Sequence, residues 1–139
     1  MKRILLAVLF LLSGSLCSAG FYDDLAGGRA AMEKEDYKAA LDFLLRAEKT
    51  APENTRMSLY IDNGISYRAL KNYDMAIKYY KQAAELSPKM PDLYCNIGLA
   101  YYYKGAFKKS VEYFNRTMRS LQIPEDVAAK VRPELFKEE

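Results

Sequence analysis

The chain has 139 residues, of which half are apolar and 28% are charged, and its formal net charge is +3 at pH 7. This composition is typical of a single folded domain and excludes a disordered chain. The sequence contains 12 tyrosines and no histidine, which excludes Ser-His or Cys-His catalysis and imidazole ligation of a metal. We therefore expect no enzyme activity, no catalytic residues, no cofactor and no metal site.

The first twenty residues have the pattern of an export signal. Lys2 and Arg3 precede the unbroken apolar run Ile4–Leu12, which small and polar residues follow. The run is shorter than the ~20 apolar residues that a membrane-spanning helix needs. We expect a signal peptide at residues 1–19, cleaved after Ala19, and an exported protein that is periplasmic or secreted.

A second interpretation makes Cys17 the lipidated N-terminus of a membrane-anchored protein. This processing resembles that of bacterial lipoproteins, although Leu16 and Gly14 depart from the usual small and aliphatic residues before the cysteine. If Cys17 is removed, Cys95 is the only thiol and no intrachain disulfide can form. We expect Cys95 to act as a small apolar side chain in a helix, with an intermolecular disulfide or a reactive thiol as the alternatives.

Removal of the signal peptide would take away Lys2 and Arg3 and lower the number of basic residues from 21 to 19. With 18 acidic residues, the net charge would then be +1. This balance provides no electrostatic basis for binding nucleic acid or an anionic membrane. The expected partner is a protein or peptide segment. We expect the protein not to bind nucleic acid, and to contact a membrane only if the chain is lipidated.

The rest of the chain is predicted to form helices separated by short turns. Asp36 is the expected N-cap of the second helix, and Pro91 fits the first position of the fifth. Asn72 and Gly105 are expected in turns, since both tolerate a left-handed backbone. Apolar spacing and helix-ending residues predict helices at residues 21–34, 37–49, 57–70, 73–86, 91–104 and 107–121.

Residues 57–124 contain the same 34-residue pattern twice. Such a period indicates stacked two-helix repeats. The matching sets are Tyr60, Gly64, Tyr67, Tyr73, Ala76, Ile77 and Tyr80, and then Tyr94, Gly98, Tyr101, Phe107, Ser110, Val111 and Phe114.

This pattern resembles the tetratricopeptide repeat, whose signature has an aromatic residue, Leu-Gly, Tyr, Ala, Phe and Pro in order. Gly64 and Gly98 take the glycine position, where two helices approach too closely for a side chain, and the tyrosines fill the wedges between helices. A first repeat is weaker, since Asp24 and Ala31 replace its aromatic residues. The resemblance implies an all-α, right-handed α-solenoid. Its domain spans residues 20–139, with helix-turn-helix repeats at about 21–54, 57–90 and 91–124 and a C-terminal capping helix at 125–136.

The resemblance also implies a concave groove that is lined by the first helix of each repeat and binds a partner segment. The face opposite the repeated tyrosines and glycines carries apolar residues beyond those that a core needs, and exposed apolar area marks interaction sites. In the first repeat this face offers Leu25, Ala26, Arg29 and Met32. The candidate groove residues are Arg29, Ile61, Asp62, Ile65, Arg68, Asp92, Cys95, Asn96, Leu99, Tyr102 and Tyr103.

The sequence lacks the carboxylate clamp with which some members of the family hold chaperone C-termini. Asp62 stands at an asparagine position of that clamp, and Asn96 stands at its arginine position. Because an acidic side chain repels a carboxylate, we predict a groove for an apolar extended or helical segment, oriented by Asp62, Asp92 and Arg68. Alternatively, these apolar residues pack against a neighbouring helix, a second copy of the chain or the N-terminal segment.

The leading hypothesis is a non-enzymatic adaptor or scaffold, exported to the cell envelope or secreted. The alternative is a lipid-anchored assembly factor for an envelope or pilus complex, with the lipid on Cys17. An enzyme or its regulatory subunit is disfavoured by the absence of histidine. The oligomeric state stays open, with a homo-oligomer among the alternatives.

Overall fold

The computed structural model describes residues 20–124 and residue 127. This part of the chain contains helices and turns and no strand, which confirms the predicted all-α class. After a helix at residues 20–33 come α2 (Tyr37–Glu48), the short 3-10 helix η1 (Glu53–Thr55), α3 (Arg56–Ala69), α4 (Tyr73–Leu86), α5 (Pro91–Tyr103) and α6 (Phe107–Ser120).

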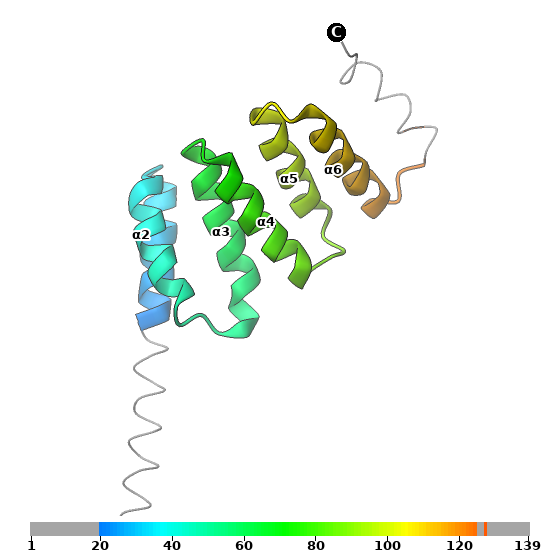
Figure 1. Ribbon diagram of the computed structural model, residues 1–139. Helices are drawn as coiled ribbons and strands as arrows, with labels where there is room; N and C mark the ends of the chain where they lie inside the picture. Colours follow the sequence, from blue (N-terminus) through cyan, green and yellow to red (C-terminus); the bar gives the residue numbers. More distant parts are fainter. Residues whose placement is uncertain (1–19, 125–126, 128–139) are drawn as a thin grey trace, which may run out of the picture.

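The helices form hairpins that stack side by side in chain order. In Figure 1, α3 and α4 (green) lie between α2 (cyan) and α5 (yellow-green), as in a solenoid. Each predicted helix begins and ends within one residue of the observed helix. The signal peptide and Cys17 lie outside the described residues, as does the capping helix apart from Val127.

Each hairpin turn contains one residue with a left-handed backbone. The φ angles are 58° at Glu35, 61° at Lys71 and 82° at Gly105. In each turn the amide of the next residue donates to a carbonyl five residues earlier, which satisfies a free carbonyl at the helix end. These hydrogen bonds are Asp36 to Ala31 (2.9 Å), Asn72 to Tyr67 (2.8 Å) and Ala106 to Tyr101 (2.9 Å).

The turn prediction is right for Gly105 and wrong for Asn72. Asn72 has a φ of −85° and is the N-cap of α4, where its side chain accepts a hydrogen bond from the backbone amide three residues on. Lys71 takes the left-handed position because the hydrogen-bond register of the turn, and not residue preference, decides which residue occupies it. Asp36 is the N-cap of α2, as predicted.

Glycines allow the two helices of each hairpin to approach closely. A Cβ atom on Gly64 would lie 2.5 Å from the Tyr80 ring, and one on Gly98 would lie 2.9 Å from the Phe114 ring. Gly27 and Gly28 in the first helix meet α2 in the same way, at 2.8 and 2.7 Å from the nearest side-chain atoms. The glycines that weaken the first helix locally therefore permit its packing.

Two clusters of buried residues connect successive hairpins. One joins the helix at residues 20–33 and α2 to Leu59 of α3. The other joins α4 to Leu93, Ile97 and Tyr101 of α5. Because each hairpin contributes to a core that it shares with its neighbour, stability depends on these interfaces.

Two positions differ from the predicted packing, and a third places a polar side chain in the core. Phe107 is the equivalent of Tyr73 in the next repeat and was therefore expected in a wedge between helices, but it is 59% exposed, since no described helix packs over that side of α6. Leu25, expected on the groove face, is buried in the core. Asn63 occupies the position equivalent to Ile97, and both side chains are fully buried. The amide oxygen and nitrogen of Asn63 have no hydrogen-bond partner.

Candidate functional site

The candidate groove residues come from three helices that share one side of successive hairpins. Arg29 lies on the helix at residues 20–33. Ile61, Asp62, Ile65 and Arg68 lie on α3, where a spacing of three or four residues puts them on adjacent turns. The other six, Asp92, Cys95, Asn96, Leu99, Tyr102 and Tyr103, lie on α5.

An ion pair joins the first two of these helices. The Nε atom of Arg29 lies 2.8 Å from the Oδ2 atom of Asp62. The Asp62 side chain is only 15% exposed, so its charge is largely neutralised by Arg29. The Asp62 carboxylate is therefore already paired within the protein at this point of the candidate groove.

The apolar residues of the groove divide into two groups. Ile61 and Ile65 pack partly against the core cluster of α4 and α5, which corresponds to the alternative that they contact a neighbouring helix. Tyr102 and Tyr103 at the end of α5 are 49% and 55% exposed. Apolar surface is therefore most accessible at the end of the groove near the turn between α5 and α6.

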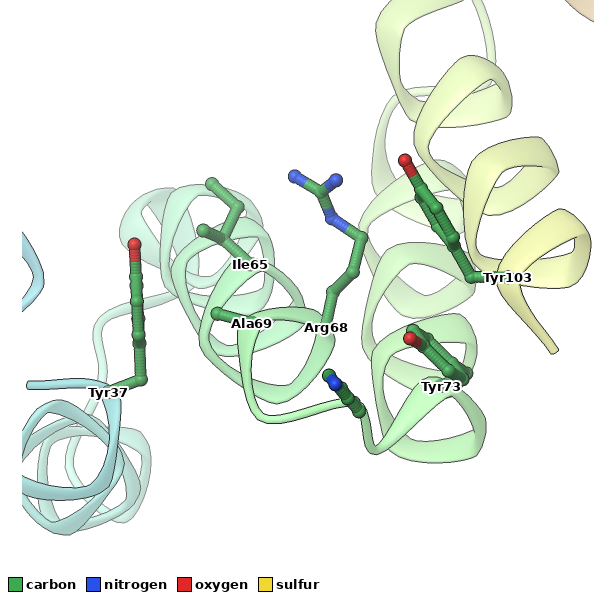
Figure 2. A pocket seen from close by; sticks show the side chains of 7 residues that line it. Tyr37, Ile65, Arg68, Ala69, Tyr73 and Tyr103 are labelled. Atoms are coloured by element: carbon green, nitrogen blue, oxygen red, sulfur yellow. The ribbon is translucent and has the colours of Figure 1, made fainter. Parts of the chain in front are cut away.

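A pocket of about 310 Å³ opens between the hairpins close to their turns. In Figure 2, Ile65, Ala69 and Arg68 of α3 lie between Tyr37 on one side and Tyr103 and Tyr73 on the other. The Arg68 side chain extends between Ile65 and Tyr103. The lining residues are Tyr37, Ile65, Arg68, Ala69, Lys71, Tyr73 and Tyr103.

Aromatic stacking fixes one wall of the pocket. The rings of Tyr73 and Tyr103 are stacked with their centroids 6.0 Å apart. Tyr102 meets Tyr103 and Phe107 edge to face, with centroid distances of 5.7 and 5.6 Å. These contacts hold α4, α5 and the start of α6 together and restrict the Tyr103 ring.

Arg68 also influences the pKa of two groups on neighbouring helices, the phenol of Tyr80 on α4 and the thiol of Cys95 on α5. Burial raises the pKa of the Tyr80 phenol, and the nearby Arg68 opposes this shift. Burial also raises the pKa of the Cys95 thiol, Asp92 adds to the shift, and Arg68 opposes it. A raised pKa keeps Cys95 protonated at neutral pH, so it lacks the thiolate character of a reactive cysteine.

The remaining candidates do not lie at the pocket. Asp92 is exposed in the first turn of α5, whereas Tyr103 ends that helix about 17 Å away along its axis. Asn96 and Leu99 lie between them and are partly buried. The candidate groove residues therefore extend along α3 and α5, and only Ile65, Arg68 and Tyr103 among them line the pocket.

Comparison with known proteins identifies the repeat. Residues 64–105 match the family model described as TPR repeat, that is, the tetratricopeptide repeat. The chain is a tetratricopeptide-repeat protein. This repeat is in general a non-enzymatic protein–protein interaction module. Among the described residues, no group of three or more acidic or cysteine side chains could hold a metal ion, and no helix is long and apolar enough to cross a bilayer.

Three similar proteins illustrate the extent of the relationship. The photosystem I assembly protein Ycf3 of Rippkaea orientalis is 27% identical over 107 residues, which cover 66% of this chain and 62% of that protein. The crystal structure of MamA is 29% identical, covers 74% of this chain and 57% of that chain, and has a TM-score of 0.61. The N-terminal domain of stress-induced protein-1 from C. elegans is 17% identical and shares the fold, with a TM-score of 0.69, covering 86% of this chain and 96% of that domain. The tetratricopeptide-repeat chain thus spans less than two thirds of the first two proteins.

Four lining residues of the pocket were not among the predicted site residues of this tetratricopeptide-repeat protein. They are Tyr37, Ala69, Lys71 and Tyr73. Tyr37 and Tyr73 each begin the second helix of a hairpin, and the repeat pattern assigns them to packing. Since both are only partly buried, they can pack and also line the pocket. For Tyr73 the available signal was its position two residues after Lys71, and the sequence offers no such signal for Tyr37.

Proposed function

We propose that this tetratricopeptide-repeat protein is a non-enzymatic scaffold that binds a segment of a partner protein along α3 and α5. The observation that supports this most directly is the exposed aromatic surface at Tyr102 and Tyr103, which continues into the pocket. Large exposed aromatic side chains in a concave, partly apolar site are typical of protein interfaces. Ile65 and Leu99, both partly buried, lie between that surface and the rest of the groove.

The experiment is affinity capture with matched variants. The double variant Ile65→Glu/Leu99→Glu places two charges in the groove, and Leu86→Glu places one on an exposed residue at the end of α4, which is not among the groove or pocket residues. We expect wild type and Leu86→Glu to retain the same partner and the double variant to lose it, with all three folded by circular dichroism. Retention of that partner by the folded double variant would contradict the proposal.

We also propose that the protein is exported, on the basis of the basic, apolar and small-residue pattern of residues 1–19. Mass spectrometry of the protein isolated from its host tests this. A chain that begins at Gly20 indicates cleavage, and a diacylated or triacylated Cys17 indicates lipidation. A protein that still contains Lys2 and Arg3 would contradict both cleavage before Gly20 and lipidation of Cys17.

A second candidate function is a lipid-anchored factor that assists assembly of an envelope or pilus complex. It is favoured by similarity to a protein whose name describes assembly of photosystem I. A factor of this kind binds a subunit before assembly and is absent from the finished complex. Copurification of the protein with the mature complex at a fixed stoichiometry would favour a permanent scaffold over an assembly factor.

A further inference from the structure

The pocket at the turn end of the groove combines positive charge with phenol hydroxyl groups. We propose that it binds the carboxylate side chain of an acidic residue within an otherwise apolar partner segment. The inference rests on the proposed function, because it names the residue type that the partner inserts into one part of the groove. It also adds an acidic residue to the sequence-based prediction of an apolar extended or helical partner segment.

The charge of the pocket is the first argument. Arg68 and Lys71 line it, and none of the lining residues is acidic. Within residues 20–124, neither cation forms a salt bridge, whereas Asp62 is paired with Arg29 and Asp74 with Lys104. The pocket therefore has uncompensated positive charge, to which an anionic group is electrostatically complementary.

The hydrogen-bond donors are the second argument. The Nε atom of Arg68 is buried with no partner within hydrogen-bonding geometry, although the guanidinium group lies close enough to the Tyr80 phenol to lower the pKa of that group against the effect of burial. In Figure 2 the hydroxyl groups of Tyr37 and Tyr103 point to the same side of the pocket as the Arg68 guanidinium group. Guanidinium and phenol groups both donate to a carboxylate, and bonds from a charged donor to a charged acceptor are the stronger kind.

The charge of the lining residues argues against a cationic ligand in the pocket. Three tyrosine rings could surround a cation through their π faces. Arg68 and Lys71 would repel such a cation at short range, so the charge of the lining decides in favour of an anion.

The volume and the apolar part of the lining define the rest of the ligand. A pocket of about 310 Å³ exceeds what a carboxylate group alone fills. Ile65, Ala69 and the stacked rings of Tyr73 and Tyr103 provide apolar surface for the methylene groups of a glutamate and for an aliphatic neighbour. We therefore expect a short motif of one acidic residue next to an aliphatic one.

Selection from a displayed library of random dodecapeptides tests this assignment. The full tetratricopeptide-repeat protein is used as wild type, as two single pocket variants and as one single control variant. Arg68→Met keeps the apolar stem of the side chain. Lys71→Asn removes the other charge and suits the left-handed backbone at that position, where φ is 61°. Lys108→Gln removes one exposed positive charge from α6 and is the matched control.

We expect peptides selected on wild type and on Lys108→Gln to be enriched in one acidic residue beside an aliphatic residue. On Arg68→Met and on Lys71→Asn, the acidic enrichment should be reduced while the aliphatic preference stays. Replacing the acidic residue of the best peptide by its amide should weaken binding to wild type about tenfold or more, because a charge-assisted hydrogen bond is lost. The same replacement should have a smaller effect on binding to Arg68→Met.

Other outcomes overturn the inference. Peptides that bind wild type without an acidic preference, and lose binding on Ile65→Glu/Leu99→Glu, would contradict the carboxylate pocket and leave the groove function intact. An acidic preference unchanged by both pocket variants would place the acidic contact elsewhere. Stronger selection of a phosphoserine peptide than of its glutamate counterpart would replace carboxylate by phosphate. If no peptide binds any form, the proposed function fails together with the inference.

Discussion

Arg29 and Asp62 form an ion pair at 2.8 Å between the helix at residues 20–33 and α3. The pair lies within the candidate groove and connects the first hairpin with the second. Asp62, which we expected to orient the partner, is thus held by the protein's own arginine. Its main effect is on the alignment of the two helices and on the local charge of the groove.

We expect the Arg29–Asp62 pair to contribute little stability. Since the Arg29 side chain is 48% exposed, solvent screens the interaction, and pairs of this type contribute about 0–1 kcal/mol. A double-mutant cycle with Arg29→Ala and Asp62→Ala should give a coupling energy in this range, decreasing in high salt. A larger coupling that salt does not change would show that the pair is effectively buried.

Asn63 should be replaceable by leucine with a gain in stability. Its side chain is fully buried, and neither atom of the amide has a hydrogen-bond partner. Removal of an unsatisfied buried polar group of similar size should raise the free energy of unfolding by about 1–3 kcal/mol. Chemical denaturation of Asn63→Leu measures this. A loss of stability would mean that the amide has a partner, such as a buried water molecule.

Gly64→Ala should destabilise the second hairpin. The added Cβ atom would lie 2.5 Å from the Tyr80 ring, which is itself fully buried and cannot move aside. We expect a decrease of about 1–3 kcal/mol in the free energy of unfolding. Gly20→Ala is the control, because nothing lies within 4 Å of its added Cβ atom. Equal melting temperatures for Gly64→Ala and wild type would rule out close packing of α3 on α4 at this position.

Stability should fall at alkaline pH because several phenols are buried. Burial raises the pKa of Tyr79 above its usual 10.0, and its hydrogen bond to Glu48 at 2.9 Å adds to the shift. Burial also raises the pKa of Tyr67 and Tyr80. Since the folded state favours the neutral phenol, this stabilisation is fully present below about pH 10 and is lost as the pH rises through the folded-state pKa values.

Denaturation of wild type and Tyr79→Phe between about pH 9 and about pH 11 tests this effect. We expect the free energy of unfolding of wild type to decrease over this range and that of Tyr79→Phe to decrease less steeply. The phenylalanine variant should be less stable at neutral pH, because it loses the hydrogen bond to Glu48. An equal or steeper slope for the variant would assign the alkaline effect to other groups.

The fold was predictable because local signals agree with the packing they produce. Gly64 and Gly98 recur at the point where the hairpin helices approach most closely, so the repeat alone indicates their role. Pro91 begins α5 and Asp36 caps α2, as their residue types favour. Lys71 was not predictable in the same way, because its left-handed backbone is imposed by the hydrogen bonds of the turn.

The site was only partly predictable. Helical spacing placed Ile65, Arg68 and Tyr103 among the groove residues, and the structure brings these three to one pocket. Tyr37 and Tyr73 come from the second helices of two hairpins, and their approach to Arg68 depends on how the hairpins stack. That stacking is a tertiary relationship that spacing along one helix does not contain. The Arg29–Asp62 pair, between residues 33 positions apart, was missed for the same reason.

Site-specific photo-crosslinking tests the central claim most directly, namely that a partner segment lies along α3 and α5. Benzoylphenylalanine is introduced at Leu99 in the groove and, as the control, at Leu86, an exposed residue at the end of α4 outside the groove and pocket residues. We predict one partner adduct from Leu99, lost when Ile65 is replaced by glutamate, and no adduct from Leu86. An adduct with the same partner from Leu86 and none from Leu99 would contradict the account.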